Sequence, residues 1–117
     1  MKSVAALFLQ AAVAAMLFTG CRVSDVREAT IVAPDVRNEA CQQVVFKALK
    51  ALPGSESLKI VTADFATGTL VVRYDSMKVG TKNLEDAIAQ AGFAAGPFPA
   101  NPEAASKLPP ECRVAGD

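Results

Sequence analysis

A short basic start followed by an uncharged apolar run limits what this chain can fold into. Met1 and Lys2 supply one positive charge, and no charged residue occurs between Val4 and Phe18. A run of about 15 such residues is typical of a secretory signal, whereas a membrane-spanning helix needs about 20 apolar residues. The run therefore predicts an exported chain in which residues 1–20 are a signal and only the residues after them fold.

The end of this run, Leu17-Phe18-Thr19-Gly20-Cys21, resembles the bacterial lipobox. In that family the Cys is lipidated and becomes the new N-terminus. The resemblance implies a lipidated Cys21, an extracytoplasmic protein anchored to a bacterial membrane without spanning it, and a tether over residues 21–27. Arg22 stands where an Asp would retain such a lipoprotein at the inner membrane, which favours the outer membrane. The alternative is ordinary cleavage nearby, with Cys21 left as a free thiol or a disulfide partner.

Charge balance excludes one class of partner. The chain has 12 Lys and Arg against 12 Asp and Glu. Nucleic-acid binding draws on clustered Lys and Arg, so a nearly neutral chain is not expected to bind nucleic acid.

Hydrophobic periodicity predicts six elements in the order β-α-β-β-α-β. The expected strands cover residues 28–33, 58–65, 70–74 and 93–98, and the expected helices cover 39–52 and 84–91. Asn38 and Asn83 are predicted to cap the two helices, and Gly92 to end the second. This order predicts an α+β, ferredoxin-like domain over residues 28–98, with two helices on one face of a four-stranded antiparallel sheet. Residues 99–117 form a Pro-rich, polar extension.

Several segments of the predicted domain resemble the heavy-metal-associated domain of copper chaperones, metal-transporting ATPases and the periplasmic mercury-binding protein. The resemblance rests on an ordered set of segments: Thr30-Ile31-Val32 before Pro34, Ala48-Leu49-Lys50-Ala51-Leu52-Pro53-Gly54, Gly68-Thr69-Leu70-Val71-Val72-Arg73-Tyr74-Asp75, and Leu84-Glu85-Asp86-Ala87-Ile88 before Ala91-Gly92-Phe93. It implies the ferredoxin-like fold more than it implies metal binding.

The metal motif of that family, Met-x-Cys-x-x-Cys, is only partly present. Val36, Asn38 and Cys41 fall at its three positions, so one Cys survives. Some secreted members end in a Leu-Pro segment followed by Cys, which implies that Cys112 folds back to Cys41. Two thiolates there would bind Cu(I), Zn(II) or Hg(II), with Asn38 and Glu39 as possible loop contributors. In an oxidising compartment the same pair would form a disulfide. A further alternative is that two molecules share an ion through their Cys41 thiolates.

Three functions compete at this point. The first is a lipid-anchored protein that sequesters a soft cation through Cys41 and Cys112, or passes it to a metal transporter or another metal-binding domain. The second is a degenerate domain without metal, which acts as an interaction or structural module with a Cys41–Cys112 disulfide. The surviving Cys41 favours the first, and the loss of the other motif residues favours the second.

The third is an enzyme, because the ferredoxin-like fold also serves acylphosphatases and Arg37-Asn38 lies in a loop suited to an anion. That comparison is an analogy of fold alone. The chain has no His and no recognisable nucleophile–base pair, so we do not expect it to be an enzyme.

Overall fold

A computed structural model of the chain describes residues 24–113. The predicted signal, the lipidation site Cys21 and the start of the predicted tether lie outside these residues. The elements are β1 (Val26–Val32), α2 (Glu39–Lys50), β2 (Lys59–Asp64), β3 (Thr69–Asp75), α3 (Thr81–Gln90), α4 (Pro102–Ser106) and a 3-10 helix, η1 (Pro110–Cys112). Among the described residues, no helix has the length and apolar character needed to cross a membrane.

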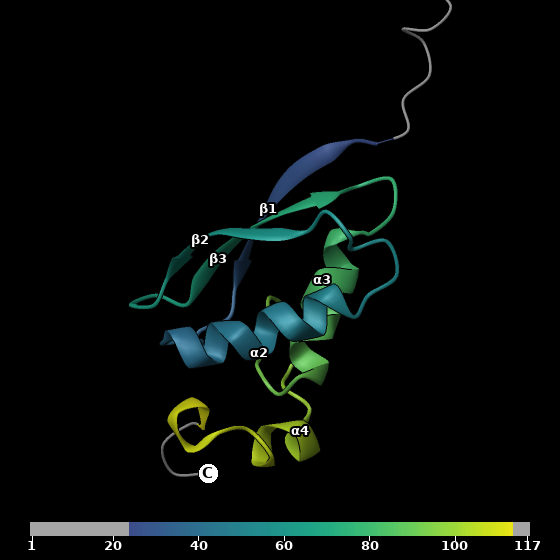
Figure 1. Cartoon of the computed structure of the whole chain (residues 1–117). Helices are drawn as coiled ribbons and strands as arrows, with labels where there is room; N and C mark the ends of the chain where they lie inside the picture. The colour runs from purple at the N-terminus through teal and green to yellow at the C-terminus, as the bar shows by residue number, and fades with distance from the viewer. Residues whose placement is uncertain (1–23, 114–117) are drawn as a thin grey trace, which may run out of the picture.

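The described strands form one antiparallel sheet in the order β1-β3-β2. Figure 1 shows α2 and α3 against one face of this sheet, with α4 and the C-terminal segment beyond them. The prediction of a four-stranded ferredoxin-like sheet with two helices is therefore wrong. The described part of the chain has three strands, and it has a third helix, α4, which was not expected.

Residues 93–98 do not form the predicted fourth strand because their backbone turns. Gly96 has a φ of 53°, in the left-handed region, and Pro97 and Pro99 have no N–H to give to a strand partner. The segment closes on itself in an isolated bridge between Ala95 and Phe98. The segment contacts the outer edge of β1 where the Gly96 N–H donates to the Val32 carbonyl oxygen at 2.9 Å.

Alternation along β1 and β3 separates a buried face of the sheet from an exposed one. In β1, Ala29 and Ile31 are buried while Glu28 and Thr30 are exposed. The buried face packs on α2 and α3 because a strand places every second side chain on the same side. The largest fully buried side chains of this core are Phe93, Ile31, Leu49, Leu70, Leu84, Ile88, Val36, Val45, Val72 and Cys41.

The helix boundaries follow local chemistry. Asn38 caps α2, as predicted, because its side chain accepts a hydrogen bond from the Cys41 N–H. The prediction that Asn83 caps the second helix is wrong, since α3 begins earlier and its N-cap is Gly80. Gly92, with a φ of 112°, follows α3 as predicted.

The C-terminal extension is folded against the domain. Asn101 caps the short α4 through a bond from the Ala104 N–H, and its own N–H donates to Ala89 O at 2.8 Å. Farther along, Leu108 and Cys112 are buried within the hydrophobic core. The extension therefore belongs to the folded domain as far as the structure describes it.

Candidate functional site

The first turn of α2 and the C-terminal η1 meet at a disulfide. Cys41 and Cys112 are 71 positions apart in the sequence and are joined with a Cα–Cα distance of 5.5 Å, within the usual range for such bonds. Cys41 is fully buried, and Cys112 is 2% exposed. The helical spacing that buries Val45 and Leu49 also turns Cys41 inward, toward the returning chain.

Asn38 reinforces this junction from the end of the helix. Its Oδ1 accepts from the Cys41 N–H at 3.0 Å, and its Nδ2 donates to the Glu111 main-chain oxygen at 3.2 Å. One amide thus closes an unpaired donor at the helix start and holds the segment that carries Cys112. It occupies both ends of its side chain in doing so.

The structure brings three of the predicted site residues together and leaves one apart. Cys41, Cys112 and Asn38 converge, whereas Glu39 is exposed in the first turn of α2. Within residues 24–113, no cluster of three or more His, Cys, Asp or Glu side chains could hold a metal ion. The thiolate is the metal ligand, and a disulfide supplies none. Metal binding by this pair therefore stays a prediction that requires reduction.

The outer edge of β1 is a second candidate site, which the sequence reasoning missed. The Ala33 N–H donates to Gly68 O at 2.7 Å, and the Ser76 N–H donates to Asp25 O at 2.8 Å. Antiparallel pairing alternates, so these bonds turn the odd-numbered residues of β1 toward β3. The main-chain groups of Val26, Glu28 and Thr30 then point away from the sheet.

The other edge of the sheet, formed by β2, has a different shape. Its register with β3 shifts between Ile60 and Thr62, which marks a bulge, whereas both edges carry exposed charges, at Lys59 and Asp64 of β2 and at Arg27 and Glu28 of β1. A bulge is one of the usual means by which a protein prevents further strands from adding to an edge. The seven-residue β1 pairs with β3 without such a shift.

One sequence signal for the open edge was present. Two prolines close to a glycine within 96–99 argue against a strand there, and without that strand β1 becomes an edge.

The chain matches no protein-family model, no curated protein and no solved structure.

Proposed function

We propose that this chain is an extracytoplasmic, lipid-anchored interaction module that receives an extended segment of a partner protein along β1. The observation that carries the proposal is the regular outer edge of that strand, to which residues 24–113 add no further strand, on the opposite side of the sheet from the β2 edge that carries a bulge. The lipid anchor and the location outside the cytoplasm rest on the sequence before Arg22.

An open strand edge selects its ligand through the main chain. The outward N–H and C=O groups of Val26, Glu28 and Thr30 are spaced to bond a segment of about five residues in extended conformation. The bond from Gly96 to Val32 O closes one end of the edge. On the solvent face, the exposed Val26 and Thr30 flank Glu28, which pairs with Arg73 of β3 at 3.0 Å. Apolar and β-branched side chains on the partner would fit beside them.

The disulfide supports a module in preference to a metal carrier. Both cysteines of the described domain are consumed by the Cys41–Cys112 bond and are buried. The bond pins the C-terminal segment to α2, which suits a rigid scaffold behind the sheet. Soft-metal binding would need this bond to be reduced first.

The edge is tested by photocrosslinking in the native cell envelope. A photoreactive residue replaces Val26, whose side chain is 56% exposed at the edge, and we expect one discrete crosslinked product. Thr30→Pro removes an N–H that points away from β3, so the sheet keeps its bonds while a partner strand loses one and meets the proline ring. We expect this variant to lose the product.

The matched control is Ala63→Pro, at the outer edge of β2. Pairing of Asp64 with Thr69 and of Thr62 with Val71 places the Ala63 N–H outward in the same way. This variant should keep the crosslink, and both variants should melt within a few degrees of the parent chain. A crosslink that survives Thr30→Pro, or one that Ala63→Pro also removes, contradicts the proposal.

A thiol count on the chain from Arg22 to Asp117, followed by titration of the reduced form with Cu(I) and Zn(II), distinguishes the interaction module from a metal carrier. We expect no free thiols before reduction, and no ion bound with submicromolar affinity after it. Uptake of one ion with loss of both thiols would instead favour a soft-metal carrier that uses Cys41 and Cys112.

A further inference from the structure

The docked C-terminal segment encloses a groove that lies apart from the β1 edge and has Cys112, one half of the disulfide, in its lining. It has a volume of about 480 Å³ and lies between the α3 end at Gly92, the α4 region and the segment around η1. Its lining is mostly apolar and comes from Ala100, Pro102, Ala105, Leu108 and Cys112, together with Ser106 and Arg113.

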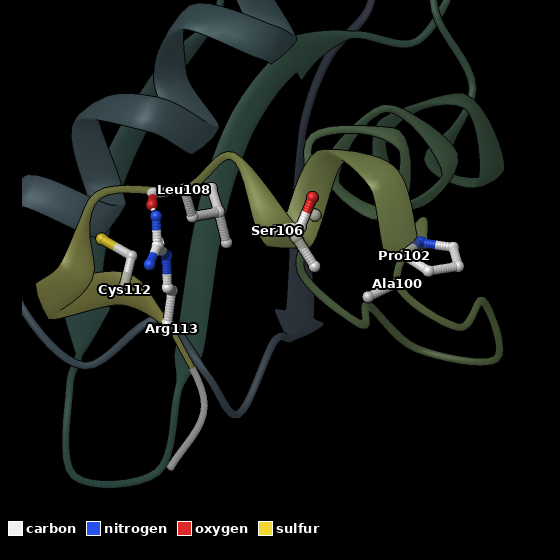
Figure 2. A pocket seen from close by; sticks show the side chains of 8 residues that line it. Ala100, Pro102, Ser106, Leu108, Cys112 and Arg113 are labelled. Carbon is white, nitrogen blue, oxygen red and sulfur yellow. Dashed lines mark hydrogen bonds between the residues drawn. The ribbon is translucent and has the colours of Figure 1, made fainter. Parts of the chain in front are cut away.

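The groove has one charged end and one apolar end. In Figure 2 the side chains of Arg113 and Cys112 stand at one end, those of Ala100 and Pro102 at the other, and Leu108 and Ser106 lie between them. Arg113 is the charged residue of this lining. The groove therefore joins a cation to an apolar floor.

The Arg113 side chain is held in place but keeps donors for a ligand. Its Nε donates to Leu108 O at 3.0 Å, which fixes the guanidinium beside the groove. Within residues 24–113, no carboxylate forms an ion pair with Arg113. The two Nη groups form the fork that binds a carboxylate through two parallel hydrogen bonds. The Ser106 hydroxyl donates to Glu103 O at 2.7 Å, so its proton is already used.

We propose that this groove binds a small amphiphilic anion, a carboxylate with a short aliphatic tail. The carboxylate lies on the Arg113 guanidinium, and the tail lies over Ala105 toward Pro102 and Ala100. Charge complementarity at one end and apolar burial at the other distinguish this ligand from a simple anion and from a neutral chain. The proposal does not depend on strand addition at β1.

The groove exists because the C-terminal segment is tied down on both sides. At the α3 end, a Cβ on Gly92 would lie 2.9 Å from the Ala105 nitrogen, so only glycine lets α4 approach this closely. At the other end, the Cys41–Cys112 bond holds the segment that carries Arg113. Ligand binding is therefore expected to weaken when the disulfide is reduced.

The test uses the chain from Arg22 to Asp117, which contains every described element, and octanoate as the probe. Octylammonium and acetate serve as comparison ligands. Calorimetry measures the affinity of each ligand, and the NMR shifts of the Gly92, Ala105 and Arg113 amides show where it binds. We expect octanoate to bind at least tenfold more tightly than either comparison ligand, with shifts centred on these three amides. Equal affinity for octanoate and octylammonium would overturn the proposal, as would octanoate shifts that avoid the groove.

Two variants test whether Arg113 itself binds the carboxylate of the ligand. Arg113→Gln should weaken octanoate binding about tenfold, because the fork that holds the carboxylate is lost. Lys107→Gln removes the same charge from an exposed residue of the same segment that does not line the groove, and should change the affinity less than twofold. Equal weakening in both variants would reduce the effect to net charge and contradict a site at Arg113.

Discussion

The side-chain amide of Asn38 donates to the main-chain oxygen of Glu111 at 3.2 Å, although the two residues are 73 positions apart. The same side chain caps α2 by accepting from the Cys41 N–H. Asn38 therefore links the start of the helix with the end of the described chain, beside the disulfide that joins the same two segments. Its two roles can be separated by substitution.

We expect Asn38→Ala to lower the free energy of unfolding by about 1–3 kcal/mol, because both the cap and the bond to Glu111 are lost. Asn38→Asp keeps an acceptor for the Cys41 N–H but has no donor for the Glu111 oxygen. It should therefore be less destabilising than Asn38→Ala. Urea denaturation of the three proteins measures the difference. Equal loss in both variants would show that the cap contributes nothing.

Removal of the disulfide should be more costly. The bond closes a loop of 71 positions, for which the chain-entropy model gives about 4 kcal/mol of stability from restriction of the unfolded chain. The double substitution Cys41→Ala and Cys112→Ala should lower the free energy of unfolding by about that amount, measured by urea denaturation. Because the bond acts on the unfolded state, reduction of the parent chain should have an effect of similar size. A loss below about 1 kcal/mol would contradict the role given to the bond.

Gly68 should not tolerate a side chain. It has a φ of 71°, and an added Cβ would collide with main-chain atoms of Ala33 and Pro34, which cannot rotate away. We expect Gly68→Ala to lower the free energy of unfolding by about 2–4 kcal/mol through strain and displacement of the end of β1. The exposed neighbour Ala66 provides the control, since Ala66→Gly should cost less than about 1 kcal/mol. Thermal melts of both variants compare them, and similar losses would count against the collision.

Asp75 should stabilise the junction between β1 and β3. It is 3% exposed, and its Oδ1 accepts from the main-chain N–H groups of Asp25 and Met77, both at 3.0 Å. Asp75→Ala leaves two donors without this acceptor, so we expect a loss of about 2–4 kcal/mol in the free energy of unfolding. Asp75→Asn keeps one acceptor oxygen and should fall between the parent and the Ala variant. Chemical denaturation checks this order, and an Asn variant with a lower free energy of unfolding than the Ala variant would contradict it.

Local patterns were sufficient to predict most of the elements. Alternation around Ile31, Leu70 and Val72, helical spacing from Cys41 to Leu49, and the cap at Asn38 all correspond to observed features. Each depends on residues within a few positions of one another, which is the range over which sequence patterns act. The missed start of α3 at Thr81 is a boundary error of the same local kind.

The number of strands could not be settled by pattern alone. The apolar residues of 93–98 suit a strand. In the structure Phe93 packs in the core, and Gly96 turns the backbone before the segment can pair along β1 as a fourth strand. Membership of a sheet is decided by long-range pairing, to which a short apolar run gives no reliable guide. Because the predicted fourth strand would have covered β1, the sequence reasoning also missed that β1 is an edge of the sheet.

The sequence by itself determined the periodicity of the strands and helices and the positions of the cysteines, because these depend on residue order alone, and export of the chain stays a prediction from residues 1–20. The tertiary structure decided which faces are covered. It placed Cys112 against Cys41, docked α4 on Gly92 and, in the part of the chain that the structure describes, added no further strand to the outer edge of β1. Those outcomes arise from packing between segments far apart in the chain, where burial and main-chain pairing outweigh local preference.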